Sequence, residues 1–180
     1  TSNQRKGVVL CGISGSGKTQ LAREYVAQLG DQFSAALWID AGSEESIDQS
    51  MSSCASRICE EILGFRKRRE STQPYQFVFE WLRTTSQKSW IVVVDNANSP
   101  IPNRRLLGPF QDMQHGALCV ISSHQVTARA LRLREISIQR LDLLASQALV
   151  LWRAYESDRE QTEEGVFSYA DSFYLLIPSS

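Results

Sequence analysis

The sequence predicts an α/β fold in which a five-stranded, doubly wound parallel sheet is flanked by helices. Apolar runs of strand length alternate along the chain with segments whose apolar residues recur at helical spacing. A glycine-rich loop joins the first apolar run to the first helical segment. The chain has 180 residues, of which 42% are hydrophobic, so it can bury the core of one α/β domain.

The first strand is predicted at Val8 to Leu10, an uninterrupted apolar run with β-branched members. Such runs are typical of strands buried on both faces of a parallel sheet. The first helix is predicted to end before Gly30, which is a candidate C-cap. Its apolar positions at helical spacing are Leu21, Ala22, Tyr25, Val26 and Leu29.

Between these two elements lies the loop GISGSGKT, from Gly12 to Thr19, with the complete pattern G-x-x-x-x-G-K-[ST] of a phosphate-binding loop. Its glycines allow successive backbone N–H groups to converge on an anion, at a helix N-terminus that adds partial positive charge. Lys18 can reach the β- and γ-phosphates, and the Thr19 hydroxyl is a natural ligand for Mg²⁺. A Gly/Ser turn without a ligand is the alternative. The candidate nucleotide contacts in this segment are Gly12, Ser14, Gly15, Ser16, Gly17, Lys18, Thr19 and Gln20.

A second strand is predicted at residues 34–40, followed by a helix with Ser43 as N-cap. Glu44 and Glu45 would lie in its first turn, where the helix dipole favours acidic side chains. The segment PYQFVFEWLRTT, which begins at Pro74, fits either a strand by alternation or a helix by spacing. We predict a helix, because a right-handed crossover is needed before the next strand.

The third strand, WIVVVD at residues 90–95, places Asp95 at its carboxyl end, where ligands of open α/β sheets collect. A carboxylate at this position can hold Mg²⁺ through water. The alternative is an Asx-turn that closes the strand, because the following NANSP also favours a turn. Lys18 and Asp95 are therefore the candidate catalytic residues, and Thr19 and Asp95 are the candidate metal ligands.

Two further strands are predicted at residues 116–123 and 134–138, and a last helix follows with Asp142 as N-cap. Residues 1–156 are thus expected to form one nucleotide-binding domain, and residues 157–180 an irregular or truncated C-terminal segment. The face of the last helix is predicted to consist of Leu144, Ala145, Ala148, Trp152 and Tyr155.

Charge and cysteine content exclude several classes of function. The 19 basic and 20 acidic residues leave a net charge of −1, so no overall field attracts nucleic acid or a membrane surface. The basic run Arg66 to Arg69 is predicted to be a solvated loop.

The 4 cysteines form no C-x-x-C pair and fit small buried residues of a reducing compartment. No stretch approaches the roughly 18 apolar residues that cross a bilayer, so a cytoplasmic location is expected. The chain has no initiating Met and is expected to be part of a longer protein.

Five segments occur along the chain in order: VVLCGISGSGKTQLAREYV, FSAALWIDAGSEESI, WIVVVDNANSP, GALCVISSH and ISIQRLDLLASQALVLW. Together they resemble the nucleotide-binding part of the NB-ARC class of STAND NTPases, the switch domain of NOD-like immune receptors and related fungal proteins. The resemblance extends from about Lys6 to Tyr155. Its selective features are the stretch Trp38 to Ala41 and the Trp-led strand that ends at Asp95. It implies ADP in a closed resting state and ATP in an open, self-associating state.

The resemblance also implies that the fourth strand lies between the first and the third, with Ser122 and Ser123 beside the phosphates. Two residues depart from the family pattern. Asn96 stands where many relatives have a second acid, and an amide cannot accept a proton from the attacking water. His124 stands where relatives commonly sense the γ-phosphate with an arginine. These departures predict at most a slow Mg-dependent ATPase.

The function predicted from the sequence is an ADP- and ATP-binding switch domain of a NOD-like signalling receptor, with Mg²⁺ as cofactor. Its full-length protein is expected to self-associate in the ATP state. Two alternatives remain open, namely a P-loop kinase acting on a small acceptor and an interaction scaffold that does not hydrolyse ATP. Kinases usually place the strand equivalent to residues 90–95 beside the loop strand and carry an arginine-bearing lid, and Arg66 to Arg69 do not lie in a lid position.

Overall fold

The computed structural model describes residues 7–62, 73–86, 89–98, 106–124, 126–148, 151 and 175–176. In this part of the chain, 6 strands form one sheet in the order β5-β1-β4-β3-β2-β6. The strands are β1 (Gly7–Cys11), β2 (Ala36–Asp40), β3 (Ile91–Asp95), β4 (Ala117–Ser122), β5 (Arg134–Ser137) and β6 (Leu175–Leu176). Strands β1 to β5 pair in parallel, which confirms the predicted five-stranded parallel sheet. Strand β4 lies between β1 and β3, as the family resemblance implied.

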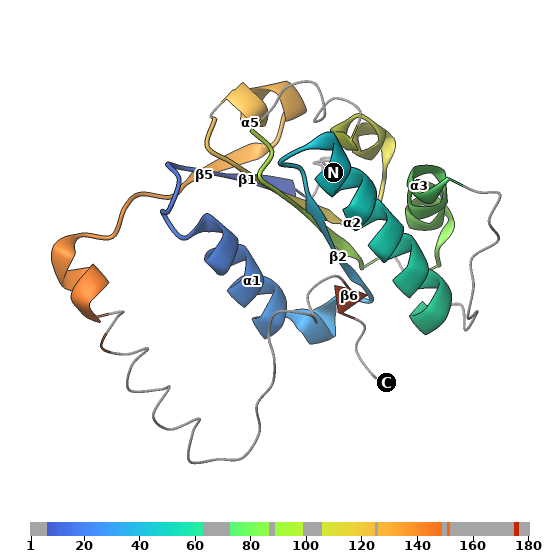
Figure 1. Cartoon of the computed structure of the whole chain (residues 1–180), viewed down its shortest axis with the longest axis horizontal. Coiled ribbons are helices and arrows are strands. Elements are labelled where there is room, and N and C mark those ends of the chain that lie inside the picture. The colour runs from blue at the N-terminus through green and yellow to red at the C-terminus, as the bar shows by residue number, and fades with distance from the viewer. Residues whose placement is uncertain are drawn as a thin grey trace, which may run out of the picture.

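Helices cover both faces of this sheet. The α-helices are α1 (Lys18–Gln28), α2 (Glu44–Arg57), α3 (Pro74–Thr84) and α5 (Val126–Leu131). Two short 3-10 helices are η1 (Gly30–Gln32) and η3 (Pro109–Asp112), and the π-helical η2 (Ile58–Ile62) continues α2. Figure 1 shows α1 on one side of the sheet and α2 and α3 on the other.

Strand β3 shows why the sheet needs helices on both faces, since all five of its residues are buried. Val92 and Val94 enter the core that α2 and α3 cover. Ile91 and Val93 enter the second core, beneath α1. The alternation of side chains along a strand therefore divides one apolar run between two cores.

Local signals set the helix boundaries. The Ser43 hydroxyl accepts a hydrogen bond from the Ser46 N–H, which confirms the predicted N-cap of α2. Pro74 begins α3, so the helical interpretation of that segment is confirmed. The predicted C-cap of α1 is wrong by one residue. Leu29 caps the helix through its N–H bond to the Tyr25 carbonyl, and Gly30 begins η1 instead.

The C-terminal part of the chain holds two differences from expectation. Leu175–Leu176 form β6, a short strand antiparallel to β2 that two residues are too few to predict. Asp142 caps the last helical segment, residues 143–148, through a 2.8 Å bond from the Ala145 N–H. The face predicted to be apolar is not buried there, since Leu144 is 77% exposed. Trp152, Tyr155 and the basic run 66–69 lie outside the described residues.

All four cysteines are buried and carry free thiols, as their positions in apolar runs predicted. Burial raises the pKa of Cys54 and of Cys119 to about 12, which keeps both thiols protonated. None of the described helices is long and apolar enough to cross a bilayer.

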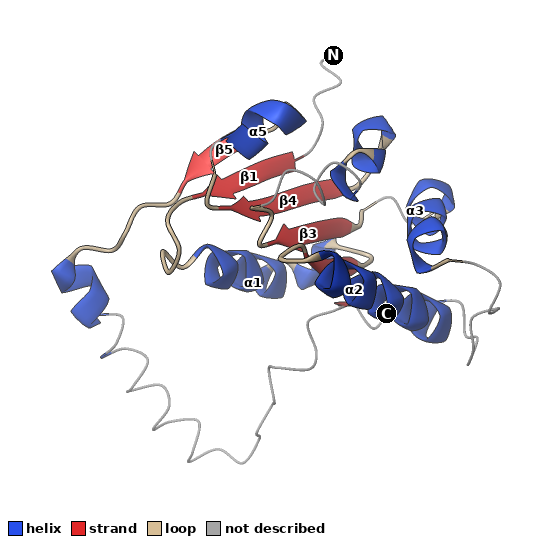
Figure 2. Ribbon diagram, turned by 45° about the horizontal axis from the view of Figure 1, so that its top comes forward, coloured by secondary structure: helices blue, strands red, loops and turns tan. Residues whose placement is uncertain are grey.

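The parallel sheet brings distant parts of the sequence to one edge. Cys11, the last residue of β1, pairs with Ser122 at the end of β4, and β3 ends at Asp95 beside them. Figure 2 shows these strands pointing the same way, so their carboxyl ends meet. The loops that follow β1, β3 and β4 therefore converge on one region.

Candidate nucleotide-binding site

The loop between β1 and α1 has the backbone of a phosphate-binding loop. Gly15 and Gly17 have φ values of 77° and 85°, in the left-handed region that side chains with a Cβ avoid. Gly17 is the N-cap of α1, so the helix begins at Lys18 with its N–H groups turned toward the loop. A Cβ at Gly12 would overlap the Ile138 carbonyl oxygen, which explains the first glycine of the motif.

The Lys18 side chain lies across this loop. Its Nζ donates to the Gly12 carbonyl over 2.8 Å and to the Ile13 carbonyl over 2.7 Å, with the Ser16 hydroxyl at 3.4 Å. The residue is only 8% exposed. The loop thus fixes one positive charge at the start of α1, where the helix dipole has the same sign.

The Thr19 hydroxyl and the Asp95 carboxylate meet across 76 residues of sequence. Thr19 Oγ1 donates to Asp95 Oδ1 over 3.2 Å, and the Asn96 N–H donates to the same oxygen over 2.8 Å. Asp95 is 5% exposed, and this burial raises its pKa while the two hydrogen bonds oppose the rise. A hydroxyl beside a carboxylate is the oxygen donor set of a magnesium site that shares its ion with phosphates. The described residues hold no cluster of three or more side chains that could bind a metal without phosphates.

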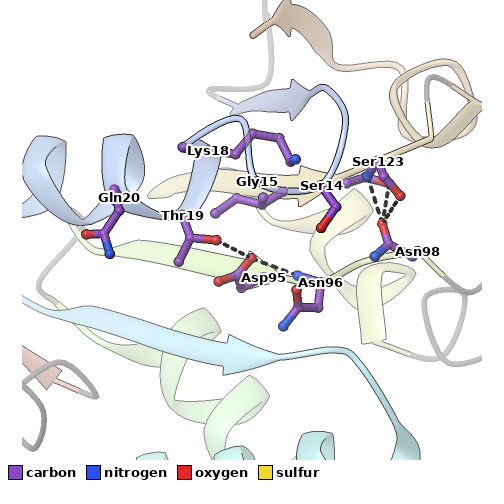
Figure 3. Close-up of a pocket in the computed structure, with 12 residues that line it drawn as sticks. Ser14, Gly15, Lys18, Thr19, Gln20, Asp95, Asn96, Asn98 and Ser123 are labelled. Carbon is purple, nitrogen blue, oxygen red and sulfur yellow. Dashed lines mark hydrogen bonds between the residues drawn. The ribbon is translucent and has the colours of Figure 1, made fainter. Parts of the chain in front are cut away.

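These elements surround a pocket of about 340 Å³ (Figure 3). Among the residues predicted from the sequence, its lining includes Ser14, Gly15, Gly17, Lys18, Thr19, Gln20, Asp95 and Ser123. Gly12, Ser16 and His124 are not in the lining. Gly12 and Ser16 instead contact the Lys18 ammonium and support the loop from behind.

His124 contributes through its backbone. Its N–H donates to the Ser122 hydroxyl over 3.0 Å, and its carbonyl accepts a 3.7 Å contact from the Cys11 thiol. These bonds connect the ends of β4 and β1. The imidazole that was expected to sense a phosphate does not line the pocket.

Two amide residues of the site were missed by the sequence analysis, which assigned them only to a turn or a departure from the pattern. Asn96 and Asn98 both line the pocket. Asn96 has a φ of 58°, and its side-chain nitrogen donates to Asp40 Oδ1 over 3.0 Å. Asn98 bonds to the end of β4 through its side-chain oxygen. The sequence signal was the pair of asparagines, separated by Ala97, directly after Asp95.

Solved structures with a similar fold include proteins of DNA replication. The structure of Drosophila ORC bound to GC-rich DNA and Cdc6 has 12% identity and a TM-score of 0.51, over 77% of this chain and 51% of that one. The crystal structure of a DNA replication initiation factor has 11% identity and a TM-score of 0.50, over 86% of this chain and 46% of that one. A STAND protein with a tetratricopeptide repeat sensor from Pyrococcus horikoshii has 14% identity and a TM-score of 0.47, over 92% of this chain and 24% of that one.

At these identities the likeness shows a common fold alone, and this chain spans about half the length of the ORC chain. No curated protein matches the sequence. The sequence profile of the AAA domain family matches residues 8–142, which hold the loop, Asp95, strands β2 to β5 and all of β1 except Gly7. Because that match covers more than half of the chain and includes the phosphate loop, this protein belongs to the AAA domain family of P-loop NTPases.

Proposed function

We propose that this chain is the nucleotide-binding domain of an NB-ARC-type molecular switch, which binds ADP and ATP with Mg²⁺ and hydrolyses ATP slowly or not at all. The observation that carries the proposal is a complete phosphate loop opposite a strand end that holds one carboxylate, Asp95, followed by an amide, Asn96. The same proposal assigns residues 1–156 to the nucleotide-binding domain.

Binding would use the loop in a defined way. The backbone N–H groups from Ser14 to Thr19 would surround the β-phosphate, and Lys18 would exchange its loop carbonyl partners for phosphate oxygens. Thr19 and Asp95 would hold Mg²⁺, which neutralises charge on the β- and γ-phosphates when bound. The 3.2 Å bond between their side chains supports this pairing, because it already places the two ligand oxygens side by side.

Slow hydrolysis follows from the groups around the γ-phosphate position. An attacking water is accelerated by a residue that orients it and takes its proton. Asp95 is the only carboxylate in the lining of the described pocket, and it is assigned to the metal. The Asn96 amide can orient water but cannot accept a proton.

The strand order favours the switch over a small-molecule kinase. Strand β4 separates β1 from β3, whereas the kinase alternative places the strand of Asp95 directly beside the loop strand. The scaffold alternative is weakened by the intact contacts of Lys18, Thr19 and Asp95, which packing alone does not require. A cytoplasmic NOD-like receptor that self-associates in the ATP state is the wider setting that we propose for this domain.

A single-turnover assay with ATP and Mg²⁺, with the protein in excess, tests the proposal. The expected result is that ATP is bound and remains intact far longer than the roughly 1 s that slow kinases need per turnover. Hydrolysis at about 1 s⁻¹ or faster would contradict the switch. Rapid loss of the γ-phosphate only in the presence of a hydroxyl acceptor would support the kinase, and failure to bind either nucleotide would support the scaffold.

A further inference from the structure

The orientation of the Asn98 side chain is fixed by its neighbours. The backbone N–H of Ser123 lies 2.7 Å from Asn98 Oδ1, and the Ser123 hydroxyl lies 2.9 Å from the same atom. A backbone N–H can only donate, so the atom that faces it must be the carbonyl oxygen of the amide and not the nitrogen. The Asn98 nitrogen, with its two N–H donors, therefore lies on the side away from Ser123.

A second serine holds the chain around Asn98. Ser122 is 1% exposed, and its hydroxyl lies 2.9 Å from the Ala97 carbonyl but 3.3 Å from Asn98 Oδ1. Both the Ala97 carbonyl and Asn98 Oδ1 therefore lie within hydrogen-bond distance of this hydroxyl, and the contact to Ala97 is the shorter one. The loop after β3 is thus tied to the end of β4 at two consecutive residues, which limits rotation of Asn98.

The free side of this amide faces the pocket. Asn98 lines the pocket together with Ser14 and Lys18 of the phosphate loop. Figure 3 shows the Asn98 nitrogen turned away from Ser123, below the loop that carries Ser14. Within the described part of the chain, no hydrogen bond from this nitrogen to another residue is formed.

We propose that the side-chain amide of Asn98 donates to the γ-phosphate of ATP and so distinguishes ATP from ADP at this site. The inference rests on the proposed function. With a nucleotide bound, the loop and the start of α1 would surround the β-phosphate, and Thr19 and Asp95 would hold Mg²⁺, which would neutralise phosphate charge. The outermost phosphate would then lie on the side of the pocket formed by the ends of β3 and β4, where the Asn98 side chain has two N–H donors.

Ser123, which was expected beside the phosphates, and His124, which was expected at the position that senses the γ-phosphate, are less suited to this role. The Ser123 hydroxyl uses its proton on Asn98 Oδ1, and the His124 side chain does not line the pocket. Ser123 acts as a positioning residue, since it orients the amide that touches the phosphate.

The Asn98→Asp variant tests the donor nitrogen of the amide separately from its acceptor oxygen. A carboxylate still accepts both bonds from Ser123, so the link to β4 is kept, but it has no donor for a phosphate. We expect the Kd for Mg-ATP to rise about 10- to 100-fold in this variant, because a hydrogen bond to a charged group is lost and a negative charge is added. The Kd for Mg-ADP should change by less than about 3-fold, and His124→Ala should leave both values unchanged.

Asn98→Ala removes the donors without adding charge, and its Kd for Mg-ATP should rise about 10-fold. The proposal is overturned if Asn98→Ala keeps the wild-type ratio of the two Kd values, because the effect of Asn98→Asp would then be charge repulsion alone. Equal losses for ADP and ATP in both variants would also overturn it, with the proposed function intact. If the wild-type chain binds neither nucleotide, the proposed function fails and this inference fails with it.

Discussion

The side-chain nitrogen of Asn96 donates a hydrogen bond to Asp40 Oδ1 over 3.0 Å, between the ends of two neighbouring strands. Asp40 is the register partner of Asp95, so the sheet itself brings this carboxylate beside the site. The same oxygen accepts a bond from the Gly42 N–H, also at 3.0 Å. Residue 96 therefore fits as an amide, because an acid there would face a carboxylate that already stands at the end of β2.

The variant Asn96→Asp should be less stable than the wild type at pH 7.5, by about 1 kcal/mol or less, because the contact with Asp40 is exposed. Two adjacent carboxylates raise each other's pKa in the folded chain, so the folded state binds more protons and the loss of stability shrinks as the pH falls. Thermal unfolding at pH 7.5 and at pH 4 measures both effects.

The double variant Asp40→Asn with Asn96→Asp restores one donor and one acceptor and should recover the lost stability. Equal melting temperatures of the wild type and Asn96→Asp at both pH values would show that the two sites are not coupled.

Asp95→Asn should increase the stability of the ligand-free chain at pH 7.5. Burial raises the pKa of Asp95 above its ordinary value, so stability declines as the pH rises from that value through the folded pKa, and the cost persists at neutral pH. An Asn oxygen can still accept the bonds from Thr19 and the Asn96 N–H. The advantage of the variant should therefore diminish when the pH is lowered toward 4, as measured by urea unfolding of both chains. A variant less stable than the wild type at pH 7.5 would mean that the charged form is the favoured one in the fold.

Gly116→Ala should destabilise the fold by at least about 2 kcal/mol and lower the Tm by about 4–8 °C. Gly116 has a φ of 73°, and a Cβ on it would overlap the ring of Trp90, which is buried beneath it. Gly30→Ala is the matched control, because a Cβ there meets nothing within 4 Å. A melting temperature of Gly116→Ala within about 1 °C of the control would mean that the Trp90 ring moves aside without cost.

The parts of the site that the sequence predicted are those with local signals. Glycines in the loop predict backbone torsions that other residues avoid, and Gly15 and Gly17 have them. Asp95 was predicted because it ends an apolar run of strand length. Lys18 and Thr19 follow from the same continuous motif. For these residues, the neighbours along the chain determine the position of the side chain in space.

The contacts of Asn96 and Asn98 could not be predicted in this way. Their partners Asp40 and Ser123 lie 56 and 25 positions away along the chain, and each contact depends on the register of neighbouring strands. His124 shows the converse limit. It lies two residues after the end of β4, and the family pattern at that position did not reveal that its imidazole would not line the pocket.

Calorimetric titration with Mg-ADP measures whether the loop from Gly12 to Thr19 binds the phosphates of a nucleotide. The wild-type chain should bind with a measurable Kd, and Lys18→Ala should bind about 10- to 150-fold more weakly, because a charge-assisted phosphate contact is lost. Gln28 lies at the far end of the same helix, and its side chain donates to Glu24 on the exposed face, so Gln28→Ala should bind as the wild type does. Wild-type affinity for Mg-ADP in the Lys18→Ala variant would show that this loop does not bind the phosphates.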